Sequence, residues 1–190
     1  MAIVRVRPRL CLVVCAAPPA RDVPDVVPAA QAQGWDVSVV TTPLAHALFD
    51  VRRVEAQSGM PVRTGHVCTD PGDAPVAHVL LVAPATFTTL NKVAVGIADT
   101  LATRVLAEAI AAGRPVVAAP AVLPPLSAHP VYVQTLQRLR GWGVTVVERP
   151  DTGEDPHRFP WRSALRAVAT HLTEPPRHGR PPGRPITPGT

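Results

Sequence analysis

The sequence predicts an α/β protein with a three-layer, Rossmann-like (flavodoxin-like) parallel sheet that carries helices on both faces. Short apolar runs, of which residues 76–83 (VAHVLLVA) are the clearest, alternate with longer stretches in which apolar residues recur at helical spacing. The chain is 46% hydrophobic but only 4% aromatic, so its core must be built from Val, Ala and Leu, as in strands buried on both faces. Strands that alternate with helices imply right-handed crossovers and a parallel sheet.

The first half of the chain is expected to begin with an apolar strand that Pro18 and Pro19 end. Helical spacing of apolar residues closed by Gly34, and a later Thr42-Pro43 start signal, predict two helices. The expected elements are a strand at 9–17, a helix at 22–33, a strand at 35–40, a helix at 43–55, an extended piece at 61–63 and a loop at 64–75.

The second half carries the stronger signals. A long Ala/Leu/Val-rich stretch of helical type contains one interior glycine, Gly96, and ends at Gly113 and Pro115. The expected elements are a strand at 76–83, the helical stretch at 87–112, a strand at 116–119, a helix at 131–141, a strand at 144–147 and a helix at 156–172.

The chain of 190 residues fits one domain, which we place at residues 1–172. The Pro/Gly/Arg-rich tail 173–190 is expected to be disordered, because it offers too little apolar surface to bury. The net charge is +5, but the excess basic residues lie at the two ends, and no basic face with interleaved aromatic residues indicates nucleic-acid binding. The three cysteines lack zinc spacing, so no metal is expected.

No apolar run reaches the roughly 18 residues that a membrane span needs. The basic and apolar opening resembles a signal peptide only faintly, because its apolar stretch is short and is better explained as the first buried strand. The sequence therefore predicts a cytoplasmic protein.

Three predicted strand ends carry the candidate chemistry, at residues 15–21, 41–42 and 84–89. In a parallel sheet these ends form one rim, where α/β proteins bind ligands. The segment 84–89 (PATFTT) places Thr86, Thr88 and Thr89 at a helix start, where unpaired amides and the helix dipole attract phosphate. Capping of the helix by the same threonines is an equally good explanation.

The sequence lacks the motifs that are typical of other ligand-binding sites and reaction classes. The chain has no GxGxxG after its first strand and no GxxxxGK[ST], so dinucleotide and P-loop sites lose their main support. Ser58 and Ser127 do not lie in GxSxG, which leaves serine hydrolysis without a nucleophile elbow.

One segment resembles a known family. Residues 84–89 read PATFTT and residues 91–101 read NKVAVGIADTL, and together they are similar to the motifs of the homo-oligomeric flavin-containing cysteine decarboxylases, which include phosphopantothenoylcysteine decarboxylases and lantibiotic-peptide cysteine decarboxylases. Residues 115–121 (PVVAAPA) resemble the strand that leads into the substrate clamp of that family. The likeness covers most of residues 9–150.

The resemblance implies an FMN cofactor held between the subunits of a homotrimer, or of trimers assembled further. It implies that the phosphate lies near the first loop and the isoalloxazine near the helix start at PATFTT. Two prolines remove amide donors from that first loop, and Arg21 is the residue that could compensate by pairing with the phosphate. The flavin-side candidates are Ala16, Arg21, Thr42, Ala85, Thr86, Thr89 and Asp99.

The catalytic positions depart from the family pattern. The family's histidine falls on Asp70 here, and His66 and His78 flank it. His66 in the loop and Asp70 are the candidate bases, whereas His78 is expected to have a core or subunit-interface role. Thr88 replaces the motif asparagine, keeping a hydroxyl and losing the amide.

The clamp sequence also changes, because Leu123 and Ser127 replace its asparagine and tryptophan. A changed polar contact changes which ligand a site selects. The sequence therefore predicts an FMN-binding flavoprotein with altered catalytic and clamp motifs, a possible FMN-dependent cysteine decarboxylase acting on a small-molecule or peptide thiol. The alternatives are a regulatory or scaffold flavoprotein without catalysis, and flavin prenyl transfer.

Overall fold

The computed structural model describes residues 7–65, 77–148, 155 and 158–172. Its described strands form one parallel sheet in the order β3-β2-β1-β4-β5-β6, the doubly wound Rossmann order, so the predicted fold class is confirmed. The strands are β1 (Arg9–Val14), β2 (Asp36–Thr41), β3 (Arg63–Thr64), β4 (Val79–Ala85), β5 (Val116–Pro120) and β6 (Thr145–Val146).

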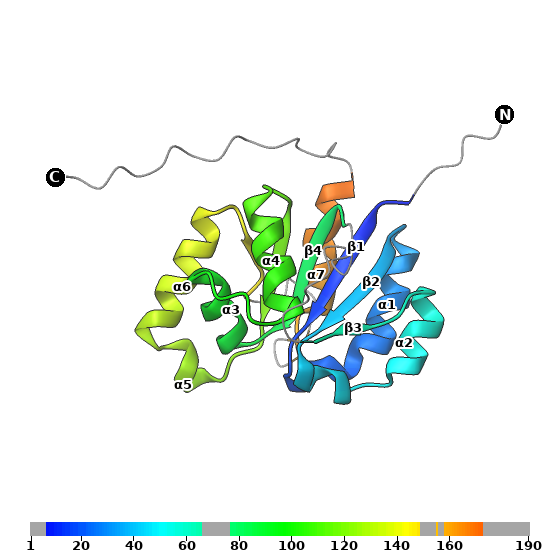
Figure 1. Ribbon diagram of the computed structural model, residues 1–190, viewed down its shortest axis with the longest axis horizontal. Helices are drawn as coiled ribbons and strands as arrows, with labels where there is room; N and C mark the ends of the chain where they lie inside the picture. Colours follow the sequence, from blue (N-terminus) through cyan, green and yellow to red (C-terminus); the bar gives the residue numbers. More distant parts are fainter. Residues whose placement is uncertain (1–6, 66–76, 149–154, 156–157, 173–190) are drawn as a thin grey trace.

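Helices cover both faces of this sheet (Figure 1). One core joins α1, α2 and α7 to the sheet, and the other joins α3, α4 and α6. Strand β1 shows the alternation, because Leu10 and Leu12 enter the first core and Cys11 and Val13 the second. The helices are α1 (Val23–Ala32), α2 (Val51–Ser58), α3 (Phe87–Ala94), α4 (Leu101–Ala111), α5 (Pro124–Ser127), α6 (Pro130–Gly141) and α7 (Trp161–Ala169), with 3-10 turns η1 (Pro18–Asp22), η2 (Pro43–Ala47) and η4 (Thr170–Leu172).

The helix expected at 43–55 is wrong, because the segment divides into η2 and α2. Asp50 caps α2 by accepting a hydrogen bond from the backbone N–H of Arg53 at 3.0 Å. Aspartate stabilises a helix start better than a helix interior, so it begins a new helix here.

The helical stretch at 87–112 also divides, into α3 and α4. Gly96 lies at φ 79°, a left-handed conformation that glycine adopts easily and that breaks a helix. Thr100 then forms a capping box with Thr103, in which each side chain bonds to the other's backbone N–H, at 3.2 and 3.0 Å. The break places Asp99 in the connection between the two helices.

Within the described part of the chain, no helix is long and apolar enough to cross a membrane. The tail 173–190, and the loop that holds the candidates His66 and Asp70, lie outside the described residues.

Candidate functional site

The loops after β1, β2 and β4 meet at the carboxyl edge of the sheet, as predicted. The backbone N–H of Cys15 donates to the carbonyl of Pro84 at 3.1 Å, and the N–H of Thr42 donates to the carbonyl of Val14 at 2.9 Å. Strands β1 and β4 are parallel neighbours, and the order of the sheet reverses between them: β2 and β3 follow on the side of β1, and β5 and β6 follow on the side of β4. This is the switch point where ligands bind in doubly wound sheets.

Helix α3 begins at this switch point, directly after Ala85. Thr86 is its N-cap and accepts from the backbone N–H of Thr89 at 3.4 Å, and the two threonine hydroxyls lie 3.0 Å apart. Capping therefore occupies Thr86 and the buried Thr89, while Thr88 is exposed. The amides of Phe87 and Thr88 in the first helical turn have no carbonyl partner within the helix, which leaves them available to a ligand.

Cys15 lies beneath the start of α3, a contact that sequence reasoning missed. Its thiol is fully buried and hydrogen-bonds with Thr89 and Thr86. Burial raises the pKa of Cys15, and these hydrogen bonds oppose the shift only in part, so the thiol remains protonated at neutral pH. The available signal was its position, the first residue of the candidate loop that follows the apolar strand.

Two buried hydroxyls at the end of β2 have no hydrogen-bond partner among the described residues. They are the Oγ1 atoms of Thr41 and Thr42. Thr42 begins η2 without using its side chain as a cap. A buried hydroxyl without a partner costs free energy, so an orphaned hydroxyl on the rim fits a polar ligand such as a flavin and its phosphate.

The first loop places its candidate residues less favourably. Ala16 is partly buried in the loop after β1, and Pro18 and Pro19 form the start of η1. Arg21 is exposed and lines a groove of about 760 Å³ that η1 and α1 share with the segment around Trp161. Arg21 stays a candidate phosphate contact.

Asp99 lies away from the other candidates. Its carboxylate pairs with Lys92 in the last turn of α3, whereas Thr86 caps the first turn. The hydrogen bond and charge of Lys92 hold the pKa of Asp99 below its usual value, so the carboxylate is ionised at neutral pH. Helix α3 has eight residues and is roughly 12 Å long, which separates Asp99 from the threonines within one chain.

The described part of the chain places none of His66, Asp70 and His78 at the rim. His66 and Asp70 lie outside these residues and stay predictions. The chain enters their loop beside α4, because the carbonyl of Gly65 accepts from the N–H of Leu101 at 3.1 Å. His78 is exposed at the amino end of β4, where its Nδ1 accepts from the N–H of Arg9 at 2.9 Å. The expected core position of His78 is therefore wrong.

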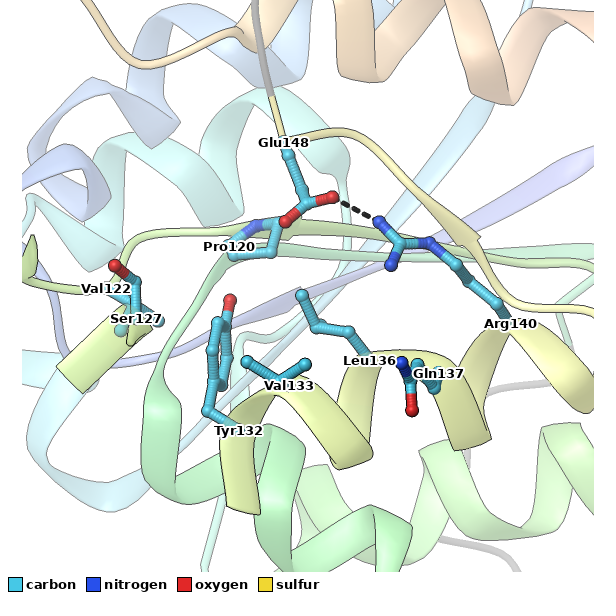
Figure 2. Close-up of a pocket in the computed structure, with 9 residues that line it drawn as sticks. All are labelled: Pro120, Val122, Ser127, Tyr132, Val133, Leu136, Gln137, Arg140 and Glu148. Carbon is cyan, nitrogen blue, oxygen red and sulfur yellow. Dashed lines mark hydrogen bonds and ion pairs between the residues drawn. The ribbon is translucent and has the colours of Figure 1, made fainter. Parts of the chain in front are cut away.

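The clamp-like segment, residues 120–127, borders a pocket of about 370 Å³ between the end of β5 and α6 (Figure 2). Val122 and Ser127 come from this segment, and Tyr132, Arg140 and Glu148 complete the polar side of the pocket. Burial, with a smaller effect of the Glu148 carboxylate, raises the pKa of Tyr132 to about 12. Its hydroxyl is therefore a permanent donor at neutral pH.

Comparison with known proteins identifies the family. The family model described as Flavoprotein matches residues 5–160. The chain belongs to the Flavoprotein family. This flavoprotein is 35% identical over 154 residues to the coenzyme A biosynthesis bifunctional protein CoaBC of Mycolicibacterium smegmatis, across 74% of this chain and 36% of that protein. It is 31% identical over 121 residues to CoaBC of Thermococcus kodakarensis, across 60% of this chain and 30% of that protein. The flavoprotein spans about a third of the length of these curated relatives.

Solved structures of similar fold include FMN-dependent cysteine decarboxylases. SpaF is 30% identical with a TM-score of 0.65, covering 85% of this chain and 97% of that one. TvaF, from thioviridamide biosynthesis, is 24% identical and has a TM-score of 0.73. The match covers 89% of this chain and 100% of TvaF, and it shows the shared fold. A dodecameric FMN-dependent Ubix-like decarboxylase from Escherichia coli O157:H7 has 17% identity and a TM-score of 0.71, over 92% of this chain and 100% of that one. The family resemblance seen in the sequence is confirmed, and it supports a flavin as the cofactor.

Proposed function

We propose that this flavoprotein binds FMN on the rim formed by β1, β2 and β4, and that it acts on a small-molecule or peptide compound that carries a cysteine-like thiol. The observation that carries the proposal is the rim itself. Thr86 and Thr89 at the start of α3, the buried thiol of Cys15 and the unpartnered hydroxyl of Thr42 meet where a doubly wound sheet binds its ligand.

The described residues have separate tasks in this proposal. The hydroxyl of Thr42 and the first amides of α3 bind polar atoms of the cofactor, and the Thr86–Thr89 pair fixes the direction of these amides. The protonated thiol of Cys15 forms hydrogen bonds with that pair and adds no charge to the site. Thr88, exposed beside them, is the candidate contact to substrate.

When bound, FMN would supply the oxidation of the thiol-bearing carbon, after which the neighbouring carboxylate leaves as carbon dioxide. A base must accept the thiol proton, and His66 and Asp70 are the proposed groups. Ala16, Ala85, Arg21 and Asp99 complete the proposed flavin contacts.

We further propose that the protein works as a homo-oligomer, most simply a homotrimer. Asp99 lies at the far end of α3 from Thr86, so one chain does not gather all the proposed flavin contacts. Several large apolar side chains are exposed around α3, α5 and α6, which lie together in Figure 1. They are Val95, Ile97, Leu123, Leu126, Val131 and Val133. A second copy that buries them would bring its own rim to Asp99.

The test begins with the purified protein. We expect a yellow protein with an FMN spectrum, and release of FMN on denaturation. Absence of flavin after expression in flavin-replete cells contradicts the proposal. Phosphopantothenoylcysteine and peptides with a C-terminal cysteine are then incubated with it, and mass spectrometry detects loss of carbon dioxide with two hydrogens.

The changed motif positions Thr88 and Leu123 favour one alternative, a flavoprotein that binds FMN without catalysis. Bound flavin with no turnover of either substrate class would support that alternative. Dependence of turnover on an isoprenyl phosphate would instead indicate prenyl transfer. An Arg21→Ala variant with unchanged FMN affinity at low salt would remove Arg21 from the phosphate site.

A further inference from the structure

The pocket between β5 and α6 shares a wall with the proposed flavin site. Pro120, on the wall of the pocket, pairs with Ala85 across the sheet, and the N–H of Ala121 donates to the carbonyl of Ala85 at 2.8 Å. Tyr132, also on the wall, stacks on Phe87 with ring centroids 5.8 Å apart. Because Phe87 is the first residue of α3, the wall of this pocket packs against the helix start that carries Thr88.

The pocket carries no net charge. Arg140 and Glu148 form an ion pair at its edge, and Figure 2 shows the two side chains pointing toward one another above Leu136. An anionic ligand therefore meets a guanidinium whose charge is already balanced, with a carboxylate beside it. Apolar surface from Leu136 and Val122 lies next to this pair.

The polar groups that remain are neutral. The hydroxyl of Tyr132 stays protonated because burial disfavours its ionised form, so it donates. The side-chain amide of Gln137 offers both a donor and an acceptor. This combination of a neutral donor, an amide and an apolar wall matches the amide groups and uncharged side chains of an acyl or peptide chain.

We propose that this pocket is the subsite that selects the arm attached to the cysteine of the substrate, and that it takes an uncharged, amide-linked arm in preference to an anionic one. The inference rests on the proposed function, since it assumes that a cysteine compound binds at the rim. The arm is the last residues of a peptide or a neutral small-molecule amide, which share this chemistry.

The experiment uses the purified protein and ligand pairs whose members differ by one anionic group. The first pair is two fluorescent peptides that end in Gln-Cys and Glu-Cys, and the second is pantothenoylcysteine with and without its phosphate. Binding is measured by anisotropy for the peptides and by competition for the small molecules. We expect the uncharged member of each pair to bind about tenfold more tightly, the effect of one unfavourable charged contact. A preference within only one pair identifies the source of the arm.

Two variants connect the preference to the pocket. Glu148→Gln frees Arg140 and is expected to abolish or reverse the charge preference. Tyr132→Phe removes one neutral donor and should weaken the uncharged ligands about fivefold. The control is Glu108→Gln, which breaks the ion pair of Arg104 and Glu108 on α4 and should keep the wild-type preference.

Several outcomes overturn the inference. They are equal binding within both pairs, tighter binding of the anionic members, and a Glu148→Gln variant that keeps the wild-type preference. A change of oligomer size in the pocket variants without a change of preference would show that a second copy fills the pocket. Flavin content is read on the same samples. Missing flavin contradicts the proposed function, whereas bound flavin without charge discrimination contradicts only the subsite.

Discussion

The substitution Thr42→Val separates a ligand-binding hydroxyl from a structural one. Its Oγ1 is buried and has no hydrogen-bond partner among the described residues, and it does not cap η2. A buried hydroxyl left unpaired costs about 1–3 kcal/mol, so the nearly isosteric valine should stabilise the flavin-free protein by about 1 kcal/mol. For a chain of this size that corresponds to a rise in Tm of about 2–4 °C.

The same substitution should weaken FMN binding. A hydrogen bond to a charged or strongly polar ligand atom contributes about 1.5–3 kcal/mol, so the dissociation constant should increase about 10- to 100-fold. Thermal unfolding of the flavin-free protein measures the first effect, and titration followed by flavin fluorescence measures the second. The two effects have opposite signs, which a general loss of structure cannot produce.

Thr103→Val is the matched control for the effect on stability. The Thr103 hydroxyl accepts from the N–H of Thr100 at 3.0 Å and donates to its carbonyl at 3.0 Å, so its removal should lower stability by about 1–3 kcal/mol. A Thr42→Val protein that is destabilised like the control, with unchanged FMN affinity, would refute the assignment of Thr42 to the flavin.

Three more predictions follow from single contacts. Thr86→Ala removes the cap of α3 and should cost about 1 kcal/mol in urea unfolding, while Thr86→Ser should restore it. Burial raises the pKa of Cys11 from 9.0 to about 12, so the native state holds this proton more tightly than the unfolded chain. Stability should then fall by about 1 kcal/mol per pH unit above pH ~9, and the slope should decrease in Cys11→Ala. Pro19→Ala restores an amide at the start of η1 and should tighten FMN binding about tenfold if this loop holds the phosphate. Pro28→Ala is its control, because the amide restored inside α1 bonds within the helix; equal affinities in both variants would exclude the loop.

The strands and the rim were predictable because their signals are local and strong. Residues 76–83 are almost continuously apolar, and a strand buried on both faces suits such a short run; the strand observed there is Val79–Ala85. Once β1 and β4 are parallel neighbours, their loops must meet at one edge. The predicted meeting of Thr42 and Thr86 at this edge followed from topology alone.

The helix breaks and the pocket could not be predicted in this way. Asp50 and Thr100 each start a new helix by accepting a hydrogen bond from a backbone N–H. Such a cap stabilises a helix by about 1 kcal/mol, and the spacing of apolar residues gives no sign of it. The pocket is assembled from β5, α6 and Glu148 after β6, and the ion pair that sets its charge joins residues on different elements. The contact of Cys15 with Thr89 likewise depends on side-chain packing between the end of β1 and the first turn of α3.

Two of the positions at which the chain departs from the decarboxylase motifs share a structural property. Thr88 and Leu123 are exposed, whereas Thr86 and Thr89 bond to each other and Thr89 is buried. Packing and hydrogen bonding constrain a buried position whatever ligand binds, but an exposed position on a rim is constrained only by what it contacts. Changes at these two exposed positions therefore alter a part of the rim that is open to a substrate, and they leave the Thr86–Thr89 pair intact. A chain that had lost ligand binding altogether would gain stability by replacing the unpartnered hydroxyl of Thr42, so its presence favours a changed substrate over a lost cofactor.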